Sequence, residues 1–365
     1  MSSLVKKPLF FLACILMVFS CLSCFRQKKP TMTTRLVTDG PGINDRSFNA
    51  AAWEGMLAFY GDERGEEEGF GVYYDVVPCR ETAQGVTVLR QVAMDEPDLI
   101  ISTGFVLEKA IAYVAPMFPN QRFLCIDCNV ENASNVLNFM FAAEEGSYLV
   151  GVAAALQAQE EGVQNPKFGF IGGVRGAIIE DFEVGYIEGI RSIFPDATVY
   201  ESYIGDWEKP ELAAKVAKKW YDDYEVYAIF SAAGASGNGT IAQAVARRKQ
   251  GKNVWAIGVD RDQFEEGYYG VEKSAVLTSM IKRVDIAVTY GLTRANKGTF
   301  VTGTMVLGLK EGAVGYTTTN PDWASSVQKK LSGIMASIIT EHIKVYSVRN
   351  NAKEAYKILQ SVVVQ

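Results

Sequence analysis

The chain has 365 residues, a net charge of −6 and a pI near 5.2. Nucleic-acid binding depends on basic patches, so this acidic balance argues against a nucleic acid as partner. A hydrophobic content of 48% and a charged content of 21% are those of a globular protein, and the length predicts two domains rather than one.

The first residues read as an export signal. Lys6 and Lys7 precede an apolar run at 9–19, which is about half of the roughly 20 residues that a membrane span needs. We therefore predict a signal peptide at 1–20. A cysteine directly after a small residue resembles the lipidation site of bacterial lipoproteins, with Cys21 expected as the lipidated residue and Cys24 as the alternative.

These features predict a protein at the cell membrane, anchored by lipid and facing the periplasm or the cell surface. Residues 25–32 are polar and contain lysine, so we expect a tether at 21–32 between the anchor and the folded part. This location argues against most cytoplasmic enzyme functions.

Strands and helices alternate along the remaining chain. This alternation predicts βαβ units, parallel sheets and an α/β fold with two doubly wound domains. Strands are expected at 33–39, 72–77, 99–102, 123–127, 135–141, 167–171, 198–204, 226–230, 254–259 and 275–280, with a strand-rich piece at 302–316. Helices are expected at 48–60 (with Ser47 as N-cap), 81–96, 107–117, 144–160, 181–194, 210–221, 240–248, 284–297 and 324–343.

Three cysteines lie outside the signal region: Cys79, Cys125 and Cys128. Three is an odd number and too few for a disulfide scaffold. A chain with a single histidine also offers few ligands for a zinc site. The apolar neighbours of Cys125 indicate a buried thiol. A disulfide or redox chemistry is the alternative, and the sequence does not tell whether Cys79 pairs with Cys125 or Cys128.

Three aspartates follow apolar strands directly: Asp39, Asp127 and Asp260. In open parallel sheets, ligands bind beyond the carboxyl ends of the strands. A carboxylate there accepts hydrogen bonds and suits the paired hydroxyls of a sugar. One such aspartate often only starts a turn, but three in separate units favour a binding site.

Four further residues join this hypothesis. Lys282 follows a short apolar strand and would offset the negative charges. Phe48 and Trp207 stand at a helix start and in a loop, where rings from two domains could sandwich a flat heterocycle, each stack contributing about 1–3 kcal/mol. Gly234 belongs to a glycine-rich turn that lets the backbone approach a ligand. Each also has a structural reading, as a surface lysine, a core edge or a plain turn.

Signals of catalysis are weak. The glycine-rich turn is neither a phosphate-binding P-loop nor a dinucleotide fingerprint, and no GxSxG motif occurs. The single histidine, His342, falls in the last expected helix and reads as a surface residue. We expect no enzyme, cofactor or metal. The alternative is a nucleoside hydrolase, because carboxylates near a ribose can act as acid and base.

The chain resembles the basic membrane protein family of bacterial lipoproteins, and within it the purine nucleoside receptors. The stretches that carry the resemblance span nearly the whole mature chain in the order of the family. They are Asn44–Asn49 with Trp53–Gly55, Glu145–Ser147 with Val150–Ala154, Gly237–Gly239, Gly258–Gln263 and Leu277–Arg283.

The resemblance implies a type I periplasmic-binding-protein fold, in which two α/β lobes joined by three crossing segments close over a ligand. It also implies a purine nucleoside as ligand and the permease and ATPase of an ABC importer as partners. The implied lobes are 33–148 plus 263–303 and 149–262 plus 304–365.

Position by position, the resemblance assigns roles to eight residues. Asp260 and Lys282 would hold the ribose, with Gly234 close by. Asp39 and Asp127 would read the purine edge or the sugar, and Asn49 would assist. Phe48 and Trp207 would sandwich the base.

The family usually has Phe where Trp207 stands, and Trp keeps the stacking but widens the platform. A related branch of the fold binds riboflavin, so a flavin or another nucleoside-like ligand is the alternative. A surface adhesin or immunogenic lipoprotein that has lost transport is a further alternative.

Overall fold

The computed structural model describes residues 30–40, 42–66, 69–323 and 325–365. Its first sheet has six strands in the order β13-β5-β4-β3-β1-β2, and all of them are parallel. The strands are β1 (Thr34–Asp39), β2 (Tyr74–Cys79), β3 (Leu99–Thr103), β4 (Phe123–Ile126), β5 (Val136–Phe141) and β13 (Gly303–Leu307).

The second sheet has seven strands in the order β14-β12-β9-β8-β6-β7-β15, and only β14 runs antiparallel to its neighbour. A separate hairpin joins β10 (Tyr268–Gly270) and β11 (Lys273–Ser274). The strands of the sheet are β6 (Lys167–Gly172), β7 (Val199–Tyr203), β8 (Val226–Ala232), β9 (Trp255–Asp260), β12 (Val276–Lys282), β14 (Val314–Tyr316) and β15 (Val363–Val364).

The two sheets share one strand order. In the first, neighbouring strands follow the order β2-β1-β3-β4-β5, and in the second the order β7-β6-β8-β9-β12. Both follow the 2-1-3-4-5 order of doubly wound folds, in which ligands bind where the winding reverses. The reversal points lie between β1 and β3 and between β6 and β8, so the α/β fold class is confirmed and two binding edges follow from it.

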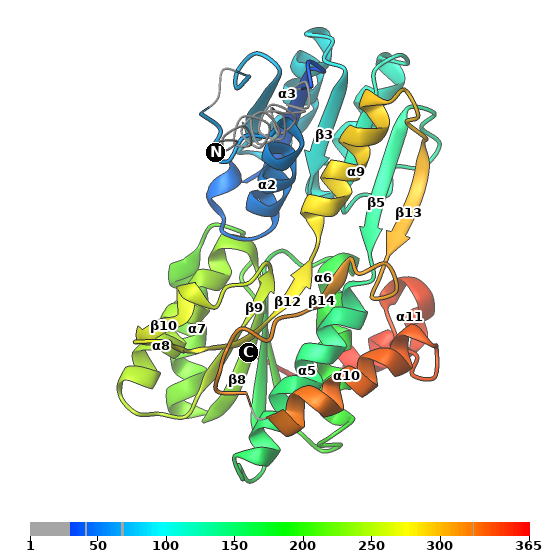
Figure 1. The fold of residues 1–365 in the computed structure, drawn as a ribbon. Helices are drawn as coiled ribbons and strands as arrows, with labels where there is room; N and C mark the ends of the chain where they lie inside the picture. Colours follow the sequence, from blue (N-terminus) through cyan, green and yellow to red (C-terminus); the bar gives the residue numbers. More distant parts are fainter. Residues whose placement is uncertain (1–29, 41, 67–68, 324) are drawn as a thin grey trace, which may run out of the picture. The chain divides into compact units, whose positions relative to one another are not determined.

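Helices cover both faces of each sheet (Figure 1). In the first, α2 and α9 pack on one face and α3 and α4 on the other; in the second, α5 and α6 oppose α7 and α8. The helices are α2 (Phe48–Tyr60), α3 (Gly85–Met94), α4 (Glu108–Val114), α5 (Ala143–Glu160), α6 (Ala177–Arg191), α7 (Pro210–Asp223), α8 (Asn238–Lys249), α9 (Val284–Asn296), α10 (Ser325–Ile339) and α11 (Val348–Leu359). Short 3-10 helices cover Gly42–Asn44, Thr82–Gln84, Phe105–Leu107, Ala115–Met117, Gly234–Gly237 and Glu265–Gly267.

Strands buried on both faces explain the continuous apolar runs of the sequence. In β1, Leu36 packs with the α2 and α9 side and Val37 with the α3 and α4 side. In β4, Leu124 and Cys125 divide in the same way. Alternate side chains of a strand face opposite sides of the sheet, so both sides contribute to a core.

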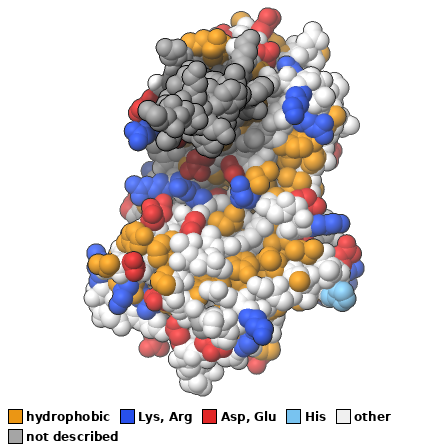
Figure 2. All heavy atoms as spheres, viewed as in Figure 1, with side chains coloured by type: hydrophobic (Ala, Val, Ile, Leu, Met, Phe, Trp, Pro, Cys, Tyr) orange, Lys and Arg blue, Asp and Glu red, His pale blue; other side chains and the backbone are white. Residues whose placement is uncertain are grey.

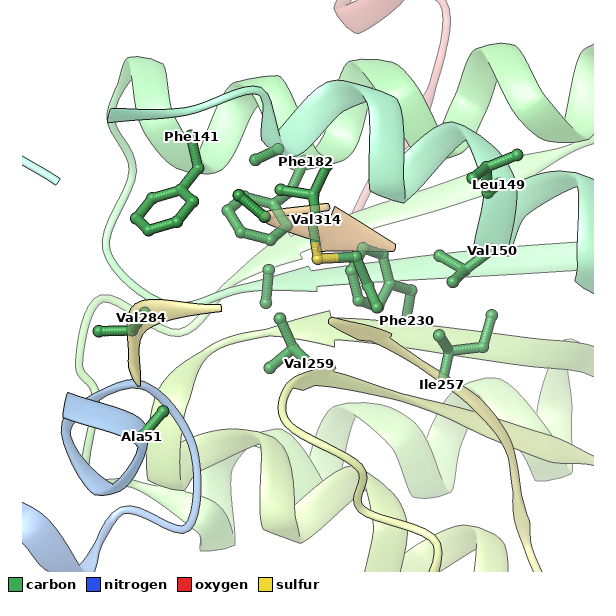
Figure 3. Close-up of a cluster of buried hydrophobic side chains, with 14 of the residues drawn as sticks. Ala51, Phe141, Leu149, Val150, Phe182, Phe230, Ile257, Val259, Val284 and Val314 are labelled. Carbon is green, nitrogen blue, oxygen red and sulfur yellow. The ribbon is translucent and has the colours of Figure 1, made fainter. Parts of the chain in front are cut away.

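One apolar cluster reaches from α2 and α9 to the second sheet. Figure 3 shows its middle, where Val284 at the start of α9 lies next to Ala51 of α2, and Phe182 and Val259 lie farther along. These buried side chains form an apolar layer directly behind the ends of β9 and β12, where polar side chains begin.

The chain changes sheets three times, after Phe141, after Lys282 and after Leu307. The predicted bounds assigned β12 to the first lobe, but β12 pairs with β9 in the second sheet. They assigned nearly all of β13 to the second lobe, but β13 pairs with β5 in the first sheet. A sequence pattern identifies a strand but not the sheet that it joins. The division into two ligand-binding lobes stays a prediction.

Most expected elements are present, and three were not expected. They are the short hairpin β10–β11, the short strand β15 and the 12-residue helix α11, none of which the sequence analysis predicted. The predicted signal peptide, tether start and lipidated Cys21 or Cys24 lie outside the described residues. Among the helices of the described part, none is both long and apolar enough to cross a membrane.

The surface of the described part mixes charges. On the face that Figure 2 shows, Lys and Arg side chains lie beside Asp and Glu side chains rather than in a basic stripe. This mixture agrees with a net charge of −6 that is small for 365 residues.

Close contact between α5 and α6 depends on glycines. A Cβ at Gly189 would stand 2.1 Å from the carbonyl oxygen of Tyr148, and one at Gly185 would stand 2.2 Å from that of Glu144. Because these obstacles are backbone atoms, they cannot rotate away. We expect Gly189→Ala to lower the free energy of unfolding by about 1–3 kcal/mol through overpacking.

Gly333 is the matched control, because it is exposed on α10 and a Cβ there would have no neighbouring atom within 4 Å. At Gly333 the same substitution should raise the free energy of unfolding by up to about 1 kcal/mol, because alanine favours a helix. Chemical denaturation of both variants measures whether the free energy of unfolding falls or rises. Equal changes in the two variants would contradict the packing argument.

Candidate ligand-binding site

A cavity with about 580 Å³ of empty space lies where the carboxyl ends of strands from both sheets meet. All eight residues singled out from the sequence line it: Asp39, Phe48, Asn49, Asp127, Trp207, Gly234, Asp260 and Lys282.

Asp39 ends β1 and is fixed by Asn49 of α2. The Asn49 side-chain amide donates to Asp39 Oδ1 at 3.0 Å and to the Asp39 carbonyl at 3.1 Å. The Thr103 hydroxyl donates to Asn49 Oδ1 at 2.6 Å, which sets the amide orientation. A Cβ on Gly104 would stand 2.2 Å from Asp39 Oδ2, so a glycine is required there, at φ +94°.

Burial raises the pKa of Asp39 to about 7, and the nearby charges of Asp45 and Asp127 act in the same direction. The hydrogen bond from Asn49 lowers it in part. Asp39 is therefore an acid that changes protonation near neutral pH, and among the described residues it forms no ion pair with a cation.

Asp45 anchors the start of α2 and was not singled out from the sequence. Its carboxylate accepts the backbone N–H groups of Asn49 at 2.7 Å, Ala50 at 2.9 Å and Ser47 at 3.0 Å. Ser47 occupies the predicted N-cap position, but its side chain makes no cap bond. The Ser47 hydroxyl instead donates to Asp260, which is 213 positions away.

Asp260 ends β9 in the left-handed conformation, with φ +66°. Burial raises its pKa to about 6, while Lys282 and the bond from Ser47 act against that shift. The Gln263 side chain holds the turn by accepting the backbone N–H of Val259 at 2.9 Å.

Lys282 ends β12 and is almost completely buried, with 2% of its surface exposed. Its ammonium group forms an ion pair with Asp127 at the end of β4, so it joins the two sheets. The rings of Phe48, Phe141 and Phe182 lie 4.8, 5.1 and 5.3 Å from it. It is the only basic residue among the described residues that line the cavity.

Trp207 packs against the glycines of the second sheet. A Cβ on Gly173 would stand 2.1 Å from its six-membered ring, and one on Gly234 would stand 3.6 Å from it. The Phe105 ring meets the indole edge to face at 6.1 Å. Phe48 and Trp207 thus enter one cavity from the two sheets.

The cysteine prediction was partly wrong. Cys125 and Cys128 are buried, as expected for Cys125, but they form a disulfide with each other across the end of β4. Cys79 is a buried free thiol, so it pairs with neither. Burial raises its pKa above the ordinary thiol value.

Sequence reasoning missed other residues of the cavity wall. Phe182 faces the core side of α6, where its helical spacing gives no sign of a binding role. Asp45 stands in a loop three positions before α2 begins. This position was the one signal in the sequence that its carboxylate could bind the first N–H groups of the helix. Within the described residues, no group of three or more His, Cys, Asp or Glu side chains is arranged to hold a metal ion.

Contacts between the two sheets also occur beside the cavity. The side chains of Asn238 and Gln263 donate to the carbonyls of Asp45 and Arg46 at 3.4 and 3.3 Å. Arg261 forms an ion pair with Glu54 at 3.2 Å. Loops of the second sheet therefore rest on the start of α2 in the described conformation.

Solved structures share the fold. An ABC transporter solute-binding protein of Aeropyrum pernix superposes with a TM-score of 0.78 at 22% identity, covering 90% of this chain and 96% of the other. An ABC transporter solute-binding protein of Conexibacter woesei superposes with a TM-score of 0.60 at 20% identity, covering 86% and 99%.

Relatives in sequence cover most of the chain. The CD4+ T-cell-stimulating antigen of Listeria monocytogenes is 37% identical over 86% of this chain and 87% of its own length. The ABC transporter nucleoside-binding protein BmpA of Lactococcus lactis is 32% identical over 78% and 81%. Basic membrane protein A of Borreliella burgdorferi is 29% identical over 88% of both.

The family model described as "ABC transporter substrate-binding protein PnrA-like" matches residues 33–349. The resemblance stated from the sequence is thereby confirmed, and the chain is a substrate-binding protein rather than an enzyme. With nearly all of the folded part matched, the chain belongs to the PnrA-like family of ABC transporter substrate-binding proteins.

Proposed function

We propose that this substrate-binding protein captures purine nucleosides such as inosine, guanosine and adenosine and delivers them to an ABC importer. The observation that carries the proposal is the composition of one cavity, which combines four aromatic side chains, Phe48 and Trp207 among them, with several strand-end carboxylates and a single ammonium group. A purine nucleoside offers a flat base and paired hydroxyls, and these features complement the two parts of the cavity.

The ribose would bind at the ends of β9 and β12. Asp260 has two carboxylate oxygens, of which Ser47 engages one, so the carboxylate can accept further hydrogen bonds from sugar hydroxyls. Lys282 is held by Asp127 and can donate to a ribose oxygen. The backbone of Gly234 lies close by, at φ +55°, where a side chain is disfavoured.

The base would bind between Phe48 and Trp207. Stacking on such rings contributes about 1–3 kcal/mol per ring by analogy with nucleic-acid complexes. Asp39, oriented by Asn49, would accept an N–H of the purine edge. A ligand that lacks this donor would leave the Asp39 carboxylate without its partner, which lowers affinity by about 1–3 kcal/mol.

The proposed location is the outer face of a membrane. The Lactococcus lactis relative is named a nucleoside-binding protein of an ABC transporter, and other relatives are named basic membrane proteins. These names support a permease and ATPase as partners and a place at the membrane. The predicted signal at 1–20 and a Pyrococcus furiosus relative named a lipoprotein support a lipid anchor on Cys21, or Cys24 as alternative. Ligand binding would bridge the two sheets and favour closure, which the importer then recognises.

Riboflavin is the second candidate, and Trp207 is the residue that favours it. An indole gives a wider platform than the Phe that the family usually has, and flavins are wider than purines. The same cavity would then serve flavin uptake.

Calorimetric titration of the mature protein tests the proposal. After unfolding and refolding to remove bound ligand, inosine, guanosine, adenosine, cytidine and riboflavin are added separately. We expect sub-micromolar binding of the purine nucleosides without release of free base. Riboflavin binding alone would move the function to flavin uptake, and no binding of any of the five would favour an adhesin or antigen role.

The Asp260→Ala variant should lose nucleoside binding while the fold persists. Each hydrogen bond to a charged group contributes about 1.5–3 kcal/mol, so two lost bonds weaken affinity by roughly a hundredfold or more. The fold should persist because burial raises the pKa of Asp260, which means that the folded state disfavours its charge.

Asp75→Ala is the matched control, since Asp75 lies in β2 and does not line the cavity. It should bind inosine like the original protein. Inosine titration and denaturation of both variants provide the measurement, and normal affinity in Asp260→Ala would show that the ribose site is misplaced.

Nucleoside affinity should fall as the pH is lowered through 7. A base N–H bonds the ionised form of Asp39, whose pKa is raised to about 7 without ligand, so binding and protonation compete. The sign is the same for Asp260, with its pKa raised to about 6. Between pH 7.5 and 5.5 we expect a loss of about tenfold or more.

In Asp39→Asn, only the dependence that arises from Asp260 should remain, shifted to lower pH. Inosine titrations at four or five pH values distinguish the two curves. An affinity of the original protein that is flat over this range would contradict the role given to Asp39.

A further inference from the structure

The disulfide at the end of β4 encloses a residue of the candidate site. Cys125 and Cys128 are bonded with their Cα atoms 5.6 Å apart, and Asp127 lies between them. We propose that this disulfide is a positioning device, which holds Asp127 in the conformation that pairs with Lys282 and so prepares the cavity for ligand. The proposal rests on the proposed function for its binding readout.

Asp127 has a backbone conformation that the bond can help to hold. Its φ is +57°, in the left-handed region that few residues besides glycine adopt, Asp and Asn more often than the others. Its N–H donates to the carbonyl of Phe139 at 2.8 Å, so the turn also ends the pairing of β4 with β5. In this turn the carboxylate points away from the first sheet and reaches Lys282 of the second.

The second sheet contains a matching turn without a disulfide. Asp260 follows β9 with φ +66°, and the Gln263 side chain and the Ser47 hydroxyl hold it by hydrogen bonds. The two carboxylates therefore have the same unusual conformation at equivalent edges of two sheets. One turn is secured by side-chain hydrogen bonds and the other by a covalent bond.

A general stabilising role explains the disulfide less well. In the chain-entropy account, a disulfide stabilises mainly by restricting the unfolded chain, and the effect grows with the length of the enclosed loop. Cys125 and Cys128 are only three positions apart, so this effect is near its minimum. What the bond restricts is the local path of the chain through Ile126 and Asp127.

Loss of the bond would release that path. Asp127 could then relax toward negative φ, which turns its carboxylate away from Lys282. The ammonium group would keep its aromatic neighbours Phe48, Phe141 and Phe182 but lose its ion-pair partner and its fixed position. Affinity for a ligand that Lys282 contacts would fall.

The test is a double-mutant cycle on the mature protein with inosine as the probe. The variants are C125A/C128A, Asp127→Asn and their combination, and peptide mass mapping verifies the bond in the original protein. We expect C125A/C128A to bind about tenfold more weakly, which corresponds to a displaced rather than a deleted charge partner. In the Asp127→Asn background, removal of the bond should cause no further loss.

Cys79→Ala is the matched control, because Cys79 is a buried thiol of the same apolar cluster and has no disulfide. It should change inosine affinity by less than about twofold. If C125A/C128A does not fold, the serine pair C125S/C128S, which keeps the side-chain volume, replaces it in the cycle. Unchanged affinity without the bond, or a loss that is equally large in the Asp127→Asn background, overturns the proposal.

Titration of the original protein with nucleosides shows whether the proposed function itself fails. If that protein binds none of the nucleosides, the same cycle is read in the free energy of unfolding. Coupling between the bond and Asp127 then supports the positioning role without any ligand, and additive effects overturn it.

Discussion

Four carboxyl groups and one ammonium group share a small, buried volume, and this shortage of positive charge is the constraint on which the rest of the site depends. Burying an unpaired charge is costly, so each carboxylate needs a partner. Asp127 takes the ion pair with Lys282, Asp45 takes the N-terminal N–H groups of α2, and Asp260 takes Ser47. Asp39 is left with one amide, whose hydrogen bond lowers the pKa only in part against the effect of burial. A ligand rich in hydrogen-bond donors would complete the set.

The strand order explains why these groups meet. In each sheet the winding reverses beside the first strand, which leaves a crevice at the carboxyl edge. Two such sheets placed edge to edge bring two crevices onto one cavity. Lys282 shows the consequence most directly, because it ends a strand of the second sheet and pairs with a carboxylate that ends a strand of the first.

Sequence reasoning identified residues that line the cavity where a polar side chain directly follows a strand end. Asp39, Asp127 and Asp260 each interrupt an apolar run, and a carboxylate that follows a buried strand can be recognised without a structure. It failed where the answer depends on long-range pairing. The sheet joined by β12 is set by distances in space, which spacing along the chain does not encode. Other failures have local causes. Phe182 serves the core and the cavity with one ring, so its apolar spacing indicates only the core.

The contacts beside the cavity bear on how the two sheets would separate. The pair between Arg261 and Glu54 is exposed, and such pairs contribute about 0–1 kcal/mol. The two hydrogen bonds that side-chain amides donate to the carbonyls of Asp45 and Arg46 are long, at 3.4 and 3.3 Å. Ordinary hydrogen bonds contribute only about 0.5–1.5 kcal/mol each. These contacts alone hold the sheets together weakly. Inside the cavity, the ion pair of Lys282 with Asp127 and the hydrogen bond from Ser47 to Asp260 also cross between the sheets. Under the proposed function, a nucleoside that engages Asp39 on one side and Asp260 on the other would add to these contacts and so favour closure.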